Sequence, residues 1–517
     1  MTSDRPTRVD LWLLTSVLLG IGLRLLYYTA PYADAHRWRQ VENLAIAWNF
    51  YDRSLNPFYP EAIWAGLSGG YVEMEFPFVP WLLAASWRMF GFHELFGRAI
   101  AIIASVVLIL AIYQIGKRLF GPGPGRAAAF LIAVSPTAVF FGRVPMTDTP
   151  MIACSTVAVM AYLFYFSTSH VRWAILGGAA ALGAWLLKIP SLLILGPIAI
   201  IAYRARGLRL LMRDTAFIGS LAAAFVLAIA WYWHADQLFR ATEWTVGIWH
   251  RAGMHPMDIA RFSPQQSDFS LWSSWRLLTS PEFYQTLGER LWLIHLTPGG
   301  LLGVMLGVVL AFVRPGGIIP LIWFAAALAF IFVVGHGNFW HEYYQLPLLP
   351  PAALLFGIGA GALFENRSLS NDWRSRLVTW TTPVILIVFA ISSFYFSEII
   401  RSYFRPETRD NEIIASGTGV ASAVAPTNGL IVVEYEEGTN SPMLLYFAKR
   451  RGWSFDTHSI SPAAITYLKS KGATHFATTI YSLLEDKRPE VIEFLKTQHE
   501  VVLPPGTPEE TRLFALD

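Results

Sequence analysis

Long apolar runs separated by short basic loops occupy most of the chain up to about residue 397. A run of about 20 apolar residues is long enough to cross a bilayer as a helix. With the clusters of arginine and lysine placed in the cytoplasm, this pattern predicts about eleven transmembrane helices and an outside C-terminus. The expected spans are residues 9–28, 97–117, 126–142, 149–167, 172–187, 189–203, 214–234, 298–313, 318–335, 344–363 and 378–397.

Two runs decide how many spans there are. The run 77–90 contains about 14 residues and an arginine near its end, which suits an interfacial helix better than a crossing. The run 172–203 is interrupted by Lys188 and Pro190, which predicts a helical hairpin whose outer turn holds the lysine. The alternative for the second run is one very long helix.

The pattern changes to that of a soluble domain after about residue 400. Residues 429–435 and 474–480 have the composition of strands, and helices are expected to end at Gly452 and Gly472. We therefore expect two domains. A transmembrane domain spans 1–400, with outer loops at 29–96 and 235–297, and a small extracytoplasmic α/β domain spans 401–517.

Composition supports a membrane protein and excludes several other classes. The chain is 54% hydrophobic and only 15% charged, which is too apolar for an ordinary soluble enzyme. A formal net charge of +3 argues against binding to nucleic acid. The single cysteine, Cys154, excludes a disulfide within the chain. The first apolar run is long enough to span, so we interpret it as an uncleaved anchor, although residues 33–35 resemble a signal-peptide cleavage site.

A compact group of charged residues follows the first span. Asp34 stands beside His36, Arg37 and Arg39, the combination that can deprotonate a hydroxyl while neutralising a phosphate leaving group. The alternative is an interfacial salt bridge with snorkelling arginines. The stretch alone leaves both interpretations open.

Further charged residues are expected on the same outer side. Glu73 and Glu75 precede the interfacial run, while Arg143 and Asp148 lie at the outer end of the third span. Any one of these charges is commonly explained as an ordinary helix end. Three separate elements that bring acids and arginines to one membrane face indicate a site there.

Two aromatic stretches also belong to the expected outer side. In "GHGNFWHEYYQLP", His336, His341 and Glu342 line a cavity or bind a divalent metal, but their spacing matches no compact zinc pattern. The adjacent tyrosines, including Tyr344, are interpreted as interfacial aromatics. The tryptophans of loop 235–297 fit either a lid over a sugar or interfacial anchors.

Four of these motifs, in order along residues 10–365, carry a resemblance to a known family. The stretches "DAHRWRQVENLAIAWNFY", "EMEFPFVPWLLAA", "FGR...M.D.P" and "HEYYQLPLLPPAALL" resemble the bacterial GT-C glycosyltransferases of family 39. These enzymes are similar to lipid A aminoarabinose transferases and protein O-mannosyltransferases. The resemblance implies a GT-C fold in the bacterial inner membrane, with the active site and the C-terminal domain on the extracytoplasmic side.

The resemblance also implies a reaction and its residues. A sugar would pass, with inversion, from a polyprenyl-phosphate-linked donor to a hydroxyl of a lipid, glycan or protein acceptor. Asp34 would act as the base or orient the hydroxyl, although Ala35 replaces the second acid that many members carry. Asp148 matches the family's other acid and Glu75 its acidic-proline motif. The donor phosphate would depend on Arg143, Lys188 or Arg39, without a tightly bound metal.

Two rival functions remain from the sequence. A lipid or small-molecule transporter or flippase is disfavoured, because the apolar segments lack acids at mid-depth and the chain shows no inverted repeat. A scaffold with a degenerate site is also compatible with the sequence. The identity of the sugar, the acceptor and the polyprenol length depends on cavity shape and is not encoded in these motifs.

Overall fold

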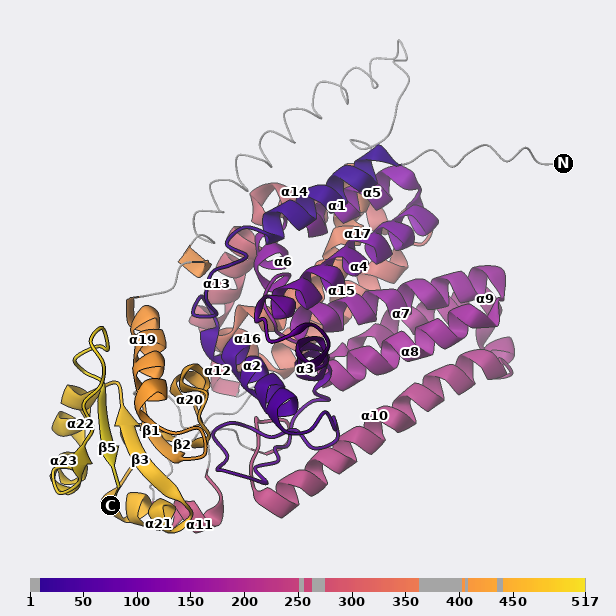
Figure 1. The fold of residues 1–517 in the computed structure, drawn as a ribbon. Helices are drawn as coiled ribbons and strands as arrows, with labels where there is room; N and C mark the ends of the chain where they lie inside the picture. The colour runs from indigo at the N-terminus through magenta and orange to yellow at the C-terminus, as the bar shows by residue number, and fades with distance from the viewer. Residues whose placement is uncertain are drawn as a thin grey trace. The chain divides into compact units, whose positions relative to one another are not determined.

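The computed structural model describes residues 10–250, 255–262, 275–361, 402–404, 408–434 and 440–516. Most of these residues are helical, and one small sheet lies near the C-terminus (Figure 1). Contacts group the chain into two compact units. Unit 1 holds residues 1–28, 98–228 and 270–402, and unit 2 holds residues 29–97, 229–269 and 403–517.

Unit 1 is built from helices that follow the apolar runs. It contains α1 (Leu11–Arg24), α4 (Leu95–Phe120), α5 (Pro122–Val134), α6 (Pro136–Phe141), α7 (Asp148–Thr168), α8 (Val171–Leu187), η1 (Ile189–Ile194), α9 (Leu195–Leu211), α12 (Trp275–Leu278), α13 (Pro281–Arg290), η2 (Leu291–His295), α14 (Thr297–Ala311), α15 (Ile318–Val333), α16 (Gly335–Trp340), η3 (Glu342–Leu348) and α17 (Leu349–Ala360). Within this unit α7 packs against α8, and α14 packs against α17. The helix α10 (Thr215–Thr242) runs past its expected end at residue 234, and the boundary between the units falls inside it.

Four helices among the described residues are long and apolar enough to cross a membrane, and a fifth is possible if the bent pair 281–295 and 297–311 forms one span. Large apolar side chains such as Val226, Leu302 and Val309 are more than half exposed, as lipid-facing side chains are. The expected total of about eleven spans stays a prediction. The span expected at 378–397 lies outside the described residues.

The predicted break at Lys188 is confirmed. The helix α8 ends at Leu187, and Lys188 adopts an extended conformation with φ −161° and ψ 127°. Pro190 then opens the 3-10 helix η1, because proline cannot donate the backbone hydrogen bond that a continuous helix needs. A single long helix across 172–203 is therefore wrong.

Unit 2 begins with two helices from the first outer loop. These are α2 (Arg37–Asp52) and α3 (Phe78–Phe90), which pack against each other. The helix α3 has 13 residues. At about 1.5 Å per residue it is about 20 Å long, too short to cross the hydrocarbon core and compatible with the expected interfacial helix.

The C-terminal part of unit 2 is a mixed sheet with helices. Its elements are α11 (Met257–Ala260), α19 (Thr408–Ala423), β1 (Gly429–Val433), α20 (Met443–Ala448), β2 (Gly452–Phe455), α21 (Pro462–Ser470), β3 (Ala473–Thr478), α22 (Tyr481–Lys487), α23 (Pro489–Leu495), β4 (His499–Glu500) and β5 (Arg512–Ala515). The strand order is β2-β1-β3-β5-β4, with β1 parallel to β2 and β3, and β5 antiparallel to β3 and β4. All five residues of β1 are buried, as expected for a central parallel strand.

One predicted helix end in this domain is wrong. The helix α20 stops at Ala448, because Lys449 takes a left-handed conformation with φ 51°. Gly452 instead opens strand β2, where its missing side chain lets the carbonyl of Leu430 approach closely. The second helix ends at Ser470, just before Gly472 with φ 102°, as expected.

The first outer loop extends the sheet inside unit 2. Ala65 forms an antiparallel bridge with Trp453 on the edge strand β2. Gly452 N–H donates to the Ile63 carbonyl at 3.1 Å, and Gly66 N–H donates to the Gly452 carbonyl at 2.8 Å. The loop thereby covers a sheet edge that would otherwise present unpaired backbone groups. The C-terminal segment and the first outer loop therefore form one compact body.

Candidate functional site

Asp34 is a buried carboxylate just before the N-terminus of α2. Its exposed fraction is 1%, and its Oδ1 accepts a hydrogen bond from Gln40 Nε2 at 2.5 Å. The same Gln40 amide group donates to the Ala35 carbonyl at 2.7 Å. His36 precedes α2 in a left-handed conformation with φ 58°, which turns the chain from Asp34 into the helix. The partial positive charge of the helix N-terminus favours an ionised carboxylate here.

The C-terminal segment holds the residues around Asp34 in place. Ala35 N–H donates to the Tyr403 carbonyl at 3.0 Å. On the other side of Asp34, the Tyr32 hydroxyl donates to the Glu94 carbonyl at 2.9 Å. The Glu94 carboxylate accepts from the Tyr446 hydroxyl of α20. Two contacts within unit 2 thus link the Asp34 segment to residues 403–446.

Lys449 completes the cluster at Glu94. Its Nζ lies 3.5 Å from Glu94 Oε1 and 3.2 Å from the centroid of the Tyr446 ring. Burial lowers the pKa of Lys449 to about 8, against the opposing effect of Glu94. Burial, together with Glu94, raises the pKa of the Tyr446 phenol well above its ordinary value. Tyr446 is therefore a neutral donor to the Glu94 carboxyl group at physiological pH.

The three basic candidates next to Asp34 are half-buried. They are His36, Arg37 and Arg39. The guanidinium carbon of Arg39 lies 4.8 Å from the ring centroid of Trp38, a cation–π geometry. The His36 ring meets the Tyr403 ring edge-on at 6.4 Å. All three positions lie on or next to the first turn of α2, and Arg37 and Arg39 place positive charge there.

The two acids before α3 have different surroundings. Glu73 is fully buried and links the first loop to residues 245–250. Its carboxylate accepts hydrogen bonds from the Thr245 hydroxyl and from Trp249 N–H, the second at 3.3 Å. The carboxylate also lies 3.2 Å from His250 Nδ1. Glu75 is half-buried and makes no hydrogen bond or ion pair to another described residue. Glu73 therefore has a structural role, whereas Glu75 has no such role in holding the loop.

Asp148 and Lys188 form a buried ion pair in unit 1. Lys188 Nζ lies 2.8 Å from Asp148 Oδ1. The same ammonium lies 5.0 Å from the ring centroids of Tyr343 and Tyr344. Tyr343 is only 3% exposed, so its interpretation as an interfacial aromatic is wrong. Within unit 1 these residues present one cation held by a carboxylate and two aromatic faces.

Arg143 is buried beside the end of the first helix. Its Nη1 donates to the carbonyls of Leu26 at 3.1 Å and Tyr27 at 2.9 Å, and its exposed fraction is 0%. These carbonyls follow the last turn of α1, where backbone acceptors lack helical partners. Part of this guanidinium therefore stabilises the chain end that leads toward Asp34 in the sequence.

The stretch 336–344 is an aromatic and polar cluster. The rings of His341 and Tyr343 stack with centroids 5.1 Å apart, and Glu342 is 5% exposed. His336 and Tyr344 are half-buried in the same stretch. In the part of the chain that the structure describes, no three His, Cys, Asp or Glu residues come together as metal ligands. We assign no residue of this cluster to a metal.

The tryptophans of loop 235–297 divide between core and surface. Trp244 is buried against Trp64, with ring centroids 5.4 Å apart. Trp249, Trp275 and Trp292 are 53%, 81% and 44% exposed. Trp244 is therefore a core residue, and the choice between sugar lid and membrane anchor concerns the exposed three. Trp272 lies outside the described residues.

One buried acid was missed by the sequence analysis. Glu42 on α2 is 2% exposed, and both its carboxylate oxygens accept from Trp64 Nε1, at 3.2 and 3.1 Å. Burial raises the pKa of Glu42 to about 7. The position of Glu42 within "QVENLAIAW" could have indicated it, because an acidic residue lies there among apolar residues of a helix.

The candidate residues divide between the two units. Unit 2 contains the Asp34 group and Glu75, and unit 1 contains the remaining candidates: Arg143, Asp148, Lys188, His336, His341, Glu342 and Tyr344. Each group combines acids, cations and aromatic faces. Such sets can bind an anionic, hydroxyl-rich ligand.

Comparison with solved structures identifies the fold. The chain is similar to ArnT from Cupriavidus metallidurans bound to undecaprenyl phosphate, with a TM-score of 0.63, 12% identity, and 98% of both chains covered. It is also similar to the archaeal oligosaccharyltransferase AglB from Archaeoglobus fulgidus in complex with an inhibitory peptide and a dolichol-phosphate, with a TM-score of 0.56, 11% identity, and 95% of this chain and 72% of that chain covered. The fold is that of the GT-C membrane glycosyltransferases.

A protein-family model also matches part of the sequence. Residues 75–233 match the model described as dolichyl-phosphate-mannose-protein mannosyltransferase. No curated protein matches the chain. The resemblance to the family 39 glycosyltransferases is thus confirmed by an independent sequence model as well as by the fold.

Proposed function

We propose that the chain is a glycosyltransferase that moves a sugar from a polyprenyl-phosphate-linked donor to an acceptor hydroxyl on the extracytoplasmic face of a bacterial inner membrane. The observation that carries the proposal is Asp34: a carboxylate 1% exposed, fixed by Gln40 and placed before a helix N-terminus beside three basic residues. The mannosyltransferase family match and the ArnT fold support the same reaction class.

Asp34 would act on the acceptor. Its carboxylate takes the proton from the acceptor hydroxyl, or orients it, as that oxygen attacks the anomeric carbon. The bond from this carbon to the phosphate oxygen breaks, and the polyprenyl phosphate leaves with the electron pair. Attack opposite to the leaving group inverts the anomeric centre. Because Gln40 fixes one carboxylate oxygen, the base meets the hydroxyl in a set orientation.

The leaving phosphate needs positive charge. Lys188 supplies an ammonium whose position is set by Asp148 and by two tyrosine rings, and Arg143 and Arg39 are the further candidates. Asp148, the second catalytic candidate, would orient this lysine. His336, His341 and Glu342 are further candidates for contact with the donor in unit 1, and Glu75 would accept hydrogen bonds from sugar hydroxyls.

The experiment follows labelled polyprenyl-phosphate sugars in membranes that contain the wild-type chain or Asp34→Asn. We expect the wild type to move label from one donor into an acceptor and Asp34→Asn to lose at least about a hundredfold in rate, the lower range for a lost general base. Asp486→Asn is the matched control, because Asp486 is an exposed aspartate on α22 in the same unit and belongs to none of the groups assigned to the reaction. Equal rates for Asp34→Asn and wild type would overturn the proposal, and lipid translocation without a new glycosidic bond would indicate a flippase.

A further inference from the structure

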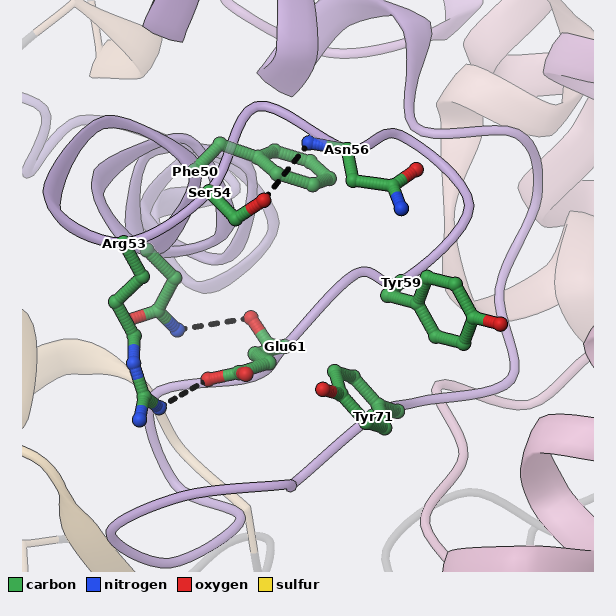
Figure 2. A pocket seen from close by; sticks show the side chains of 8 residues that line it. Phe50, Arg53, Ser54, Asn56, Tyr59, Glu61 and Tyr71 are labelled. Carbon is green, nitrogen blue, oxygen red and sulfur yellow. Dashed lines mark hydrogen bonds and ion pairs between the residues drawn. The ribbon is translucent and has the colours of Figure 1, made fainter.

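Unit 2 contains a cavity at the C-terminal end of α2. Its volume is about 120 Å³, and its lining includes Asn49, Arg53, Asn56, Tyr59, Glu61 and Tyr71 (Figure 2). All these residues belong to the first outer loop. None of them contributes to the groups assigned to the transfer reaction.

Several polar groups of this lining keep hydrogen-bonding capacity. Asn56 accepts from Phe58 N–H through Oδ1 at 3.1 Å, but its Nδ2 donates to no described residue. The hydroxyl groups of Tyr59 and Tyr71 likewise make no hydrogen bond to a described residue, and Glu61 Oε1 accepts none. Amide, hydroxyl and carboxylate groups arranged around a small space match the alternating donors and acceptors of a sugar ring.

Aromatic rings form one wall of the cavity. The Tyr59 and Tyr71 rings lie with centroids 5.2 Å apart, at an angle of 59°, and the Tyr71 hydroxyl points toward the Glu61 side in Figure 2. Tyr59 is 45% exposed, so its face is accessible from solvent. An accessible aromatic face packs well against the apolar C–H face of a pyranose.

The charges of the lining cancel. Arg53 Nη1 lies 2.5 Å from Glu61 Oε2, and no other charged side chain lines the cavity. A single cation paired with a single acid gives no net attraction for a phosphate or a carboxylate. The cavity therefore favours a neutral ligand.

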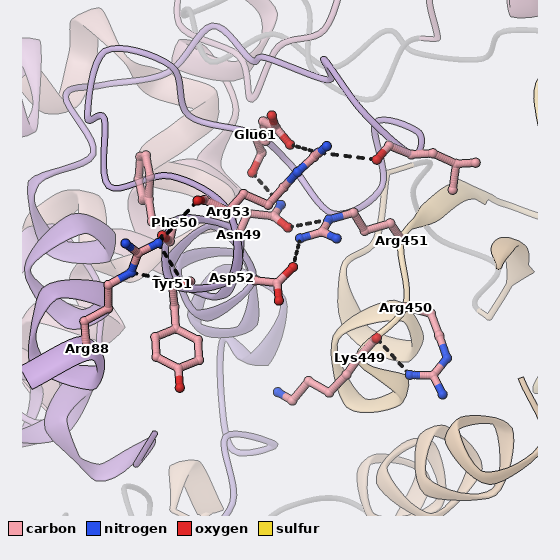
Figure 3. A network of polar contacts seen from close by, with 11 residues as sticks. Asn49, Phe50, Tyr51, Asp52, Arg53, Glu61, Arg88, Lys449, Arg450 and Arg451 are labelled. Carbon is pink, nitrogen blue, oxygen red and sulfur yellow. Dashed lines mark hydrogen bonds and ion pairs between the residues drawn. The ribbon is translucent and has the colours of Figure 1, made fainter. Parts of the chain in front are cut away.

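Hydrogen bonds fix the C-terminal end of α2, which frames the cavity. Arg88 of α3 donates to the carbonyls of Phe50 at 3.1 Å and Tyr51 at 2.9 Å, which closes the C-terminal end of α2 (Figure 3). Arg451 donates to Asn49 Oδ1 at 3.0 Å and to Asp52 at 2.7 Å. A preformed frame lowers the entropy that binding must overcome.

The cavity is far from Asp34. Asp34 precedes α2 and the cavity lies at its other end, and a helix of 16 residues is about 24 Å long. One sugar unit cannot reach across this distance. We propose that the cavity is a saccharide subsite that binds a neutral sugar unit of an extended acceptor glycan, remote from the hydroxyl that receives the transferred sugar. The assignment of the bound sugar to an acceptor glycan rests on the proposed function. The binding of a neutral sugar in the cavity does not.

The test measures binding without any donor. The full chain in lipid nanodiscs is examined by saturation-transfer NMR with neutral trisaccharides of glucose, galactose or mannose, each alone, and with a trisaccharide that carries a glucuronic acid. We expect at least one neutral probe to bind. Tyr59→Ala and Asn56→Ala should weaken its binding about tenfold each, the effect of about 1.4 kcal/mol.

Phe58→Ala is the matched control, since Phe58 is a neighbouring aromatic residue, 52% exposed, that does not line the cavity. It should bind like the wild type. Asp34→Asn should also bind the sugar like the wild type. A protein that lacks transfer activity but keeps the subsite is thereby distinguished from one that lacks the subsite. Absence of binding by every neutral probe, binding of the acidic probe alone, or equal losses in Phe58→Ala and Tyr59→Ala would each overturn the subsite.

Discussion

The buried acid Glu42 should make the stability of the protein depend on pH. Its pKa is raised from 4.5 to about 7, because burial penalises the charged carboxylate. That difference corresponds to about 3 kcal/mol, at about 1.4 kcal/mol for each pH unit. Between these two values the folded state binds more protons than the unfolded state. The contribution of Glu42 is therefore fully present below pH 4.5 and is lost as the pH rises through 7.

Glu42→Gln removes this ionisation. The glutamine side chain has nearly the same shape, and its carbonyl oxygen can still accept from Trp64 Nε1, so the helix packing should persist. We expect the variant to melt at a higher temperature than the wild type at pH 8 and to lose the dependence on pH between 5 and 7. The assay is thermal unfolding of the full chain in nanodiscs at one scan rate, because unfolding of a membrane protein is commonly irreversible.

Glu485→Gln is the control for Glu42, because it makes the same substitution at a glutamate whose side chain is 50% exposed. It should leave the pH profile unchanged. A Glu42→Gln variant less stable than the wild type at pH 8 would show that the carboxylate is ionised and favourably paired in the folded protein. The reasoning from burial would then be wrong.

Three further predictions concern other parts of the molecule. Lys188→Gln should weaken binding of a polyprenyl phosphate, the leaving group of the proposed reaction, at least about tenfold, measured by displacement of a labelled lipid, because it removes the cation that Asp148 holds; unchanged binding would remove Lys188 from the proposed phosphate site. Tyr446→Phe should lower kcat about tenfold with little change in lipid binding, because it breaks the hydrogen bond to the Glu94 side chain that supports the Asp34 segment; a pure KM effect would contradict this positioning role. His255, whose pKa burial lowers to about 3, must stay neutral in the fold, so stability should fall as the pH drops below 6.5, and His255→Phe should reduce this loss in thermal scans at pH 5; equal acid sensitivity in both chains would refute it.

The long apolar runs predicted most of the helices of unit 1, because such runs suit membrane helices, but the number of spans stays a prediction. The break at Lys188 followed from the chemistry of proline and of a charged residue inside an apolar run, and the structure confirms it. Strands β1 and β3 were predicted from their apolar composition. Strands β2, β4 and β5 were missed, because they are short and partly polar and depend on partners distant in sequence.

The chemistry of the site was less accessible to sequence reasoning. Asp34 was identified because a charged residue directly after a membrane span is unusual. The pairing of Asp148 with Lys188 joins residues 40 positions apart, and the hydrogen bond from Tyr446 to Glu94 joins residues 352 positions apart. Such contacts depend on tertiary packing, which one sequence does not reveal. The saccharide subsite has the same origin, since Tyr59 and Tyr71 meet only after the loop folds back at the bridge between Glu61 and Tyr71.

The contacts within unit 2 give the C-terminal segment a role that the sequence left open. A loop of about 70 residues without further support would be too mobile to hold a base within about 0.5 Å of its working position. The segment restrains this loop on both sides of Asp34, through the backbone of Tyr403 and through the Tyr446–Glu94 contact to Tyr32. It also fixes the far end of α2 through Arg451. Because α2 links Asp34 to the saccharide subsite, one rigid helix sets the distance between the proposed base and the proposed acceptor contact, and the C-terminal segment anchors both of its ends.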